Sequence, residues 1–259
     1  MIALSKRSFL MGAMAFATAR PAFAARPLIA HLNLADVPAP NGKMQRELSV
    51  DPATGATTLF FDFPANWVGG GVAHYHSFSE EIYVLSGGVT LNGRDEYVAG
   101  SYLYRPGGIV HGHHEASRPG ARFIGRMGGK LDFNYVREPT SQEEYVAKPV
   151  ADGRPHIVHL RSPDQPWQTA SDGHQLKVLS EDRVTGARSA LLQFPTAWTG
   201  KLPLDPKSGW EWFVVGGEMA LDDGTTFANE SYANRPIGAP GRSIVRAAAG
   251  TLVLTWKNA

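Results

Sequence analysis

The sequence contains no cysteine in its 259 residues. Disulfide bonds and thiolate metal sites are therefore excluded, and an oxidising compartment would place no demand on the chain. An excess of charge of one sign is also lacking, since 25 basic residues face 24 acidic ones. This balance gives no reason to expect a nucleic acid or an anionic membrane as a partner. What is abundant is glycine (28) and proline (18), which favour short strands and many turns over helices.

Residues 1–24 have the pattern of an export signal. A basic pair at positions 6–7 precedes a short apolar run, and Ala-Phe-Ala at 22–24 has the A-x-A form of a cleavage site. Residues 5–10 resemble the twin-arginine signal, with lysine in place of its first arginine. An ordinary secretory signal and a short anchor are the alternatives, although the apolar run is too short to span a bilayer comfortably. We expect a mature, periplasmic or secreted chain with 22 basic and 24 acidic residues and no membrane contact after cleavage.

Two clusters of metal-binding side chains lie between residues 69 and 115. The first reads His74-x-His76-x3-Glu80. Alternate residues of a strand face the same way, so the two histidines can project into one cavity, and Glu80 opens the next strand. The second reads Gly100-x5-Pro106-x-Gly108-x2-His111, in which a proline and glycine turn leads back into a strand that carries His111. Three imidazoles and one carboxylate facing inward would form an open site suited to Mn, Fe, Ni, Cu or Zn.

This spacing resembles the two conserved motifs of the cupin superfamily, whose members bind a divalent metal inside a small antiparallel barrel. The resemblance implies four metal ligands: His74, His76, Glu80 and His111. The sequence departs from the family pattern in two places. The glycine expected six residues before the first histidine is Val68, with Gly69 next to it, and the closing asparagine of the second motif is Glu115. Neither departure falls on a ligand position. Surface histidines on unrelated strands are the alternative interpretation.

Glu81 competes with Glu80 as the acidic ligand. The family places the carboxylate seven positions before a glycine, so counting from Gly87 favours Glu80 and counting from Gly88 favours Glu81. Glu80 shares its strand face with Ile82, which suits a barrel lining. The sequence therefore favours Glu80.

The chain also contains an internal duplication. FPANW at residues 63–67 recurs as FPTAW at 194–198, and SYLYRPGG at 101–108 recurs as SYANRPIG at 231–238. The pairs are offset by 131 and 130 residues respectively. We therefore predict an all-β fold of two tandem cupin barrels of the double-stranded β-helix, or jelly-roll, type. The predicted parts are a signal peptide (1–24), a metal-binding cupin domain (25–147) and a second cupin domain (148–259).

The second half has no imidazole at the positions equivalent to the ligands. They are occupied by Leu204 or Asp205, by Pro206 or Lys207, by Trp210, and by Gly241. We predict that this domain, which resembles the cupin domains of the anti-sigma-factor and acetylacetone-cleaving type, binds no metal. Trp210 and Trp212 are expected to fill the space instead. An apolar ligand pocket in this barrel is the alternative.

Alternation and turn residues predict the following strands: 57–63, 72–76, 80–86, 88–92, 101–105, 109–113 and 121–127, then 188–194, 211–215, 218–222, 231–235, 243–247 and 251–256. One short helix is expected within 138–148, with Ser141 as its N-cap and Glu144 at N3, and a linker near 148–156.

Three residues near the ligands are predicted to be acid–base or substrate-contacting groups. His113 lies two residues after the last ligand and would share its strand face; an exposed loop histidine is the alternative. Tyr102 and Tyr104 share one strand face and are predicted to line the pocket, with core packing as the alternative. Arg122 and Arg126 are expected on a solvated face, with binding of a substrate carboxylate as the alternative.

Four protein ligands on a six-coordinate metal leave about two positions for water, O2 or a chelating substrate. The proteins that this resemblance points to include dioxygenases, oxalate decarboxylases, isomerases and lyases. The fold alone therefore does not select one of these activities. We predict a dioxygenase-like oxidoreductase for a small diketone, phenolic or carboxylate substrate. A lyase, decarboxylase or hydrolase, and a non-catalytic binding or sensing protein, are the alternatives.

The metal is predicted to be one divalent ion. Affinity order alone would give Cu or Zn to an exported site, but folding before export would let the chain trap Mn or Fe in the cytoplasm. Mn(II) or Fe(II) is therefore favoured over Zn, Ni or Cu. Pairing of two chains into a homodimer through exposed sheet edges is left open.

Overall fold

The structure is a computed structural model that describes residues 29–31, 45–148 and 150–258. The predicted export signal lies outside the described residues. Within them the fold is all-β, and the helical residues belong to two short 3-10 turns, η3 (Glu143–Tyr145) and η4 (Ser162–Asp164). No helix in this part of the chain has the length and hydropathy needed to cross a bilayer.

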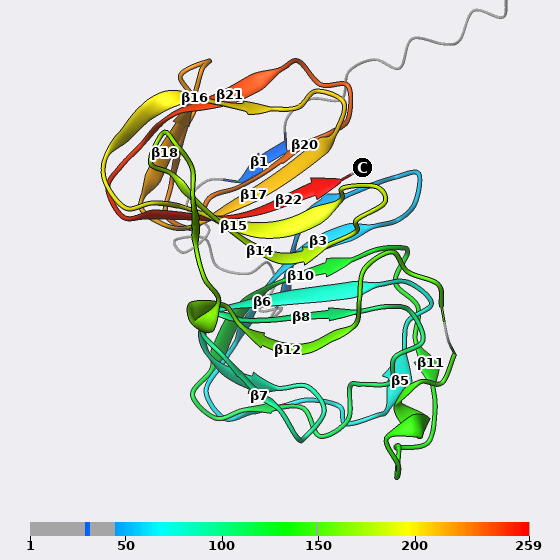
Figure 1. The fold of residues 1–259 in the computed structure, drawn as a ribbon. Helices are drawn as coiled ribbons and strands as arrows, with labels where there is room; N and C mark the ends of the chain where they lie inside the picture. The colour runs from blue at the N-terminus through cyan, green and yellow to red at the C-terminus, as the bar shows by residue number, and fades with distance from the viewer. Residues whose placement is uncertain (1–28, 32–44, 149, 259) are drawn as a thin grey trace, which may run out of the picture.

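Two β-barrels lie one above the other, the first half of the chain below and the second half above (Figure 1). The strands before the linker are β1 (Ile29–His31), β2 (Gln45–Val50), β3 (Thr57–Phe63), β4 (Trp67–Val68), β5 (His74–Tyr75), β6 (Glu80–Thr90), β7 (Glu96–Val98), β8 (Ser101–Arg105), β9 (Ala116–Ser117), β10 (Ala121–Met127) and β11 (Asn134–Tyr135). Those after it are β12 (Ile157–Arg161), β13 (Gln168–Thr169), β14 (Gln175–Glu181), β15 (Arg188–Phe194), β16 (Trp198–Leu204), β17 (Gly209–Gly216), β18 (Glu218–Leu221), β19 (Thr226–Ala228), β20 (Tyr232–Arg235), β21 (Arg242–Ala247) and β22 (Thr251–Asn258).

Each half contributes one strand to the large sheet of the other half. The large sheet of the first barrel has the order β12-β8-β6-β10-β3-β2, and that of the second has the order β1-β20-β17-β22-β15-β14-β13. Thus β12, which follows the linker, pairs antiparallel with β8, and β1, from the start of the chain, pairs antiparallel with β20. Both exchanged strands are visible in Figure 1. The sheets therefore cross the boundary at 147–148 that separates the two repeats in the sequence.

Strand bounds agree with the prediction where alternation is regular, as in β3, β8, β10 and β15. The predicted strands 80–86 and 88–92 are one continuous strand, β6. Its pairing with β10 shifts register where Val84 and Ser86 oppose Phe123 and Arg122, and Gly87 beyond has a φ of 71°. Because of this bulge, the first part of β6 pairs with β10 and β8, and its last part pairs with β7 and β9.

One predicted strand was wrong, and the predicted short helix is shorter than expected. Segment 109–113 forms only isolated bridges, at Ile109 and His111, because Gly108 and Gly112 have φ values of 84° and 79° that interrupt an extended strand. The expected helix within 138–148 is reduced to the 3-10 turn η3. Its N-cap residue makes no side-chain cap hydrogen bond, and Glu144 instead accepts a hydrogen bond from the backbone N–H of Thr140.

The two halves pack through equivalent faces. The core between them includes one set of buried side chains and its repeat: Leu48, Phe60, Tyr83, Tyr102 and Ile124 correspond to Leu179, Leu191, Phe213, Tyr232 and Leu254. Such a contact has the self-complementary character of a two-fold interface, here within one chain. The interiors of the two barrels hold separate cores.

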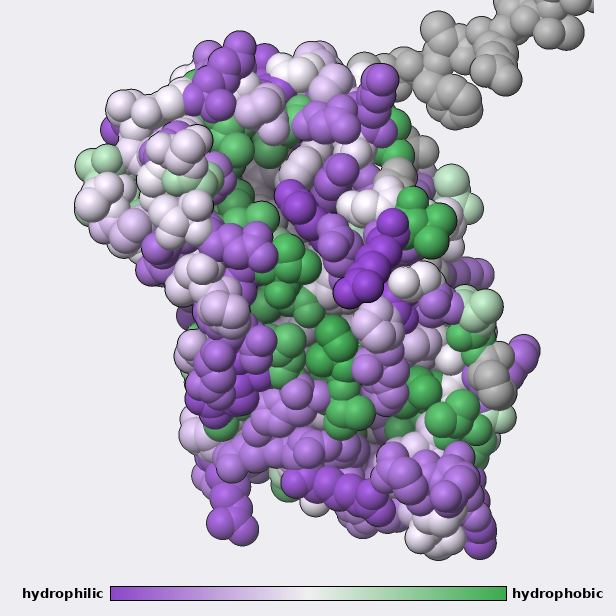
Figure 2. Space-filling view, viewed as in Figure 1, coloured by the Kyte–Doolittle hydropathy of each residue, from purple (hydrophilic) through white to green (hydrophobic). Residues whose placement is uncertain are grey.

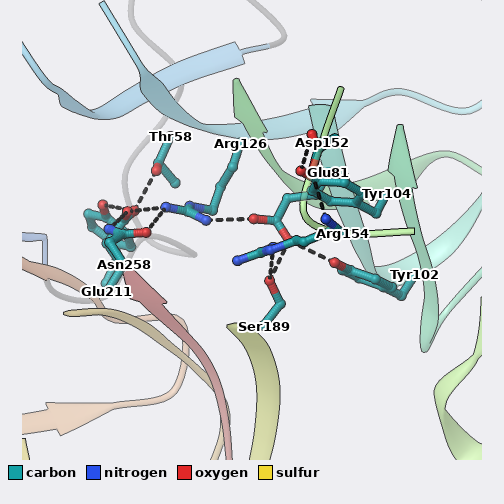
Figure 3. Close-up of polar contacts among 11 residues, drawn as sticks. Thr58, Glu81, Tyr102, Tyr104, Arg126, Asp152, Arg154, Ser189, Glu211 and Asn258 are labelled. Carbon is teal, nitrogen blue, oxygen red and sulfur yellow. Dashed lines mark hydrogen bonds and ion pairs between the residues drawn. The ribbon is translucent and has the colours of Figure 1, made fainter. Parts of the chain in front are cut away.

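A buried ion-pair network lies in this contact (Figure 3). Glu81 of the first half accepts hydrogen bonds from Tyr102 (2.8 Å) and from Ser189 of the second half. Its repeat, Glu211, accepts hydrogen bonds from Tyr232 (2.7 Å) and from Thr58 of the first half. The two carboxylates are thus held in equivalent ways by groups from both halves.

Arg126 breaks the symmetry and joins the two carboxylates. Its Nη1 lies 2.5 Å from Glu81 Oε1 and its Nη2 lies 2.6 Å from Glu211 Oε1. Burial would raise the pKa of both carboxyls, but the Arg126 charge holds each pKa below its ordinary value. The expectation of a solvated face or a carboxylate site was wrong for this arginine and for Arg122, which pairs with Glu230 of the second half at 2.5 Å. Sequence periodicity could not show that a second domain covers this face.

We predict that Arg126→Met destabilises the chain by about 3–5 kcal/mol, because it leaves buried Glu211 without its cation and Glu81 with only the more distant Arg154. Urea unfolding of the full chain measures this change. Arg122→Gln is the matched control, since its pair is more exposed and its loss should cost about 1 kcal/mol or less. A loss below 1 kcal/mol for Arg126→Met would mean that the network does not hold the halves together.

Candidate metal centre

Three histidines converge at one end of the first barrel. His74 lies on β5, and its backbone exchanges two hydrogen bonds with that of His111, N–H to O at 2.9 and 2.8 Å. His76 follows two residues after His74, and the three ring centroids are 4.6–5.1 Å apart. One nitrogen from each ring lies within 4.8 Å of the corresponding nitrogens of the other two. Among the described residues this is the one group of such side chains that could hold a metal ion.

The backbone fixes which nitrogen of each ring is free to bind a metal. Nδ1 of His74 faces the carbonyl of Val72 at 2.8 Å, and Nδ1 of His111 faces the carbonyl of Ile109 at 2.9 Å. Nδ1 of His76 is hydrogen-bonded to the carbonyl of Asp132. A carbonyl only accepts, so Nδ1 carries the hydrogen and Nε2 keeps its lone pair in each ring. The donor set therefore fits a divalent ion bound by three Nε2 atoms.

Burial also lowers the pKa of two of these imidazoles, those of His111 and His74. The pKa of His111 is lowered to about 3, first by burial and then by the positive charge of Arg105. The pKa of His74 is likewise lowered, mainly by burial. Metal ligation requires the neutral ring, so little competition from protons is expected at neutral pH.

Glu80 adjoins the histidines, whereas Glu81 does not. Glu80 Oε2 lies 3.4 Å from His111 Nε2 and accepts a hydrogen bond of 2.6 Å from Arg105 Nη1. Burial would raise the pKa of Glu80, but His111 and Arg105 together bring it to about 2, so the group is an anion. Glu81, one residue on, points to the contact between the halves. Strand alternation thus leaves Glu80 as the carboxylate on the metal side.

The three predicted acid–base residues are not brought to the histidines. His113 is buried, but its Nε2 faces the hydroxyl of Tyr145 at 3.4 Å. The prediction assumed an unbroken strand, and the turn at Gly112 ends the alternation that would have aligned His113 with His111. Within the described contacts, none joins its side chain to the three imidazoles.

Tyr102 and Tyr104 require the same correction. They do share one face of β8, but it is the face that packs on the second half: Tyr102 donates to Glu81, and Tyr104 donates to Asp152 at 2.8 Å. The neighbours that face the metal side of β8 are Leu103 and Arg105. Core packing, the alternative interpretation, is the one that the structure supports for both tyrosines.

Aromatic residues that carried no motif surround the histidines. The ring of Phe133 lies 5.0 Å from that of His74 and 5.3 Å from that of His76, and Tyr135 on β11 stacks on Phe133 at 6.1 Å. Phe133 is 48% exposed and Tyr135 66% exposed, so the site has an aromatic rim open to solvent. Figure 2 shows small hydrophobic patches among hydrophilic residues where β5 and β11 lie, apart from the larger hydrophobic band down the middle of this view. The alternating aromatics of 131–136 were the only sequence signal for this rim.

The equivalent place in the second barrel holds an arginine instead of a histidine cluster. Arg235, the repeat of Arg105, donates from Nη2 to the carbonyls of Ala239 (2.6 Å) and Pro240 (2.8 Å) and from Nη1 to that of Asp205 (3.4 Å). These carbonyls belong to the two segments of the second barrel that are equivalent to the histidine-bearing segments of the first barrel. The interior beside them is filled by an apolar core that includes Trp212, with Trp210 partly buried against it.

A cavity of about 860 Å³ lies away from the histidines, between the two halves. Its lining includes Glu81, Arg126, Arg154 and Glu211. Arg154 Nη1 lies 3.5 Å from Glu81, and Arg126 pairs with both Glu81 and Glu211. The charged groups of the cavity are therefore paired with one another. The cavity belongs to the contact between the halves and adds no group to the metal centre.

Comparison with known proteins is in accord with this geometry. Residues 27–128 match the family described as the ChrR cupin-like domain. A comparison with curated protein sequences gave no match.

Solved structures share the fold over most of the chain. A candidate dioxygenase from Nostoc punctiforme is 18% identical with a TM-score of 0.63, over 83% of this chain and 72% of that one. A mutant salicylate 1,2-dioxygenase from Pseudoaminobacter salicylatoxidans, in complex with gentisate, is 14% identical with a TM-score of 0.61, over 90% and 82%. A mutant oxalate decarboxylase from Bacillus subtilis is 15% identical with a TM-score of 0.55, over 83% and 72%. Residues 27–128 therefore carry a ChrR cupin-like domain, and the chain as a whole shares the fold of these solved structures.

Proposed function

We propose that the protein is an exported, metal-dependent oxidoreductase of the dioxygenase type that acts on a small organic substrate in its first barrel. The observation that carries the proposal is the convergence of three imidazoles, each of which has its Nδ1 atom hydrogen-bonded to a backbone carbonyl. His74, His76 and His111, with Glu80 beside them, would hold one Mn(II) or Fe(II) ion. Such an ion would supply open coordination positions for O2 and a chelating substrate.

The chain's own residues would orient the ion and the substrate. Arg105 holds Glu80 by a buried ion pair, so the carboxylate stays ionised and fixed in direction. Phe133 and Tyr135 present exposed ring surface next to the histidines, which suits a planar organic substrate. The similarity in fold to a salicylate dioxygenase bound to gentisate supports a phenolic substrate in particular.

A metal-dependent decarboxylase is the second candidate. The observation that favours it is the similarity in fold to oxalate decarboxylase over 83% of the chain. It differs from the first candidate in a measurable way, because it would release CO2 without net consumption of O2.

The test is an oxygen-electrode assay of the mature chain reconstituted anaerobically with Fe(II) or Mn(II), using gentisate, salicylate, acetylacetone and oxalate. We expect O2 uptake with at least one compound and its loss in His76→Ala. His114→Ala is the control, since this exposed histidine pairs with Glu138 outside the cluster. Release of CO2 from oxalate without O2 uptake would favour the decarboxylase, and tight binding without turnover would favour a binding protein.

We also predict that the two adjacent glutamates separate metal affinity from stability. Glu80→Gln should weaken Mn(II) binding by about 10–100-fold or more, because it removes the charged group beside the imidazoles. Glu81→Gln should leave Mn(II) affinity unchanged but lower the melting temperature, because it breaks the network between the halves. Electron paramagnetic resonance of free Mn(II) measures the first effect, and thermal unfolding of the metal-free chain measures the second. The reverse pattern would assign the ligand role to Glu81.

A further inference from the structure

The residues that mark the two departures of this chain from the cupin motifs, Gly69 and Glu115, lie next to each other in the structure. Gly69, displaced by one residue from the expected glycine position, donates its backbone N–H to the carbonyl of Glu115 at 2.9 Å. Glu115 occupies the place of the usual asparagine, and its side chain lies directly over Gly69. A methyl group added to Gly69 would come within 2.6 Å of Glu115 Oε2 and 2.7 Å of Glu115 Cβ. The glycine at 69 therefore makes room for the carboxyl at 115.

Alternation along the ladder aims Glu115 into the first barrel. Trp67 of β4 faces Ser117 of β9 and stacks on Phe63 at 3.9 Å, so this side of the ladder faces the barrel core. Val68, one residue on, is 76% exposed and marks the outer side. The next pair, Gly69 and Glu115, returns to the inner side.

The carboxyl of Glu115 has a setting that suits proton exchange. Its side chain is partly buried and makes no hydrogen bond within the described residues, so its oxygens are available to a ligand. The pKa of Glu115 is raised to about 7. Burial is the main cause and the negative charge of Glu80 adds to it, while the positive charge of Arg105 acts in the opposite direction. Those two charged groups belong to the metal centre, which places Glu115 within electrostatic reach of it.

We propose that Glu115 is the acid–base residue of the first barrel, an inference that rests on the proposed function. As a base, a Glu115 oxygen takes the proton of a phenol or enol as the substrate binds. The O–H bond of the substrate breaks, its electron pair stays on the substrate oxygen, and Glu115 becomes a neutral acid that later returns the proton. The substrate class that needs this group carries an acidic O–H beside a second oxygen.

The first test needs neither metal nor substrate. Carboxyl carbons of the metal-free full chain, labelled with ¹³C in glutamate, are titrated by NMR, and Glu115→Gln identifies the signal of Glu115. We expect a midpoint near pH 7. A midpoint below about pH 5.5, within a unit or so of an ordinary glutamate, would overturn the proposal.

Stability gives a second readout whose sign follows from the raised pKa. The folded chain binds the Glu115 proton more tightly than the unfolded chain does, so this contribution is present below pH 4.5 and is lost as pH rises through about 7. The melting temperature of Glu115→Gln relative to wild type should therefore rise between pH 5 and 8. A difference that does not change with pH would contradict a proton held in the fold.

Turnover tests the catalytic role. With a compound that the wild type oxidises, Glu115→Gln should lower kcat by about 10²–10⁴-fold at unchanged metal content and remove the rise in rate through pH 7. Glu115→Asp should restore part of the rate, and Glu96→Gln, at an exposed position on β7, should have no effect. A Glu115→Gln variant with unchanged kcat and pH profile would overturn the proposal.

Binding of 4-nitrocatechol to the Zn(II)-loaded chain separates this proposal from the proposed function. The absorbance of this phenolic chelator reports its ionisation, so no turnover is needed. At pH 7.5, where Glu115 can accept the proton, the wild type should bind it at least about tenfold more tightly than Glu115→Gln. Equal affinity and equal spectra would refute the role of Glu115, whereas a difference without any turnover of the four test compounds would refute only the proposed oxidoreductase.

Discussion

Successive side chains of β6 point to opposite faces, and this alternation separates the metal centre from the contact between the barrels. Glu80 faces the histidines and Glu81 faces the second half of the chain. Both carboxylates are buried, so each needs a cation: Arg105 supplies it on the inner side and Arg126 on the outer side. A shift of register by one residue would exchange the two roles and leave both charges with the wrong partners.

The duplication allows the metal centre to be compared with the equivalent place in the second barrel. In the first barrel a divalent ion would join the segment of His74 and His76 to the segment of His111. In the second barrel the guanidinium of Arg235 joins the corresponding backbone segments through carbonyl oxygens. Both arrangements would place positive charge between the two segments, which in the first barrel are also joined by the backbone hydrogen bonds between His74 and His111. The repeated arginine is present in both halves, with a carboxylate partner in the first (Arg105) and carbonyl partners in the second (Arg235).

Much of this arrangement follows from periodicity and from the repeat. Regular alternation predicted β3, β8, β10 and β15, and the motif spacing selected the histidines that do converge. Prediction was wrong where a glycine with positive φ interrupts a strand, as at Gly112 before His113. It also missed contacts between residues far apart in the sequence, such as the exchange of β1 and β12 and the pairing of Arg126 with Glu211. Such contacts depend on how the two halves pack, which local patterns do not encode.

The central claim is that one divalent ion is bound in the first barrel and none in its repeat. Anomalous diffraction from crystals soaked in Mn(II), recorded on both sides of the manganese absorption edge, tests it most directly. We expect a single strong peak within bonding distance of Nε2 of His74, His76 and His111. The absence of a peak there, or a principal peak in the second barrel or in the cavity between the halves, would contradict it.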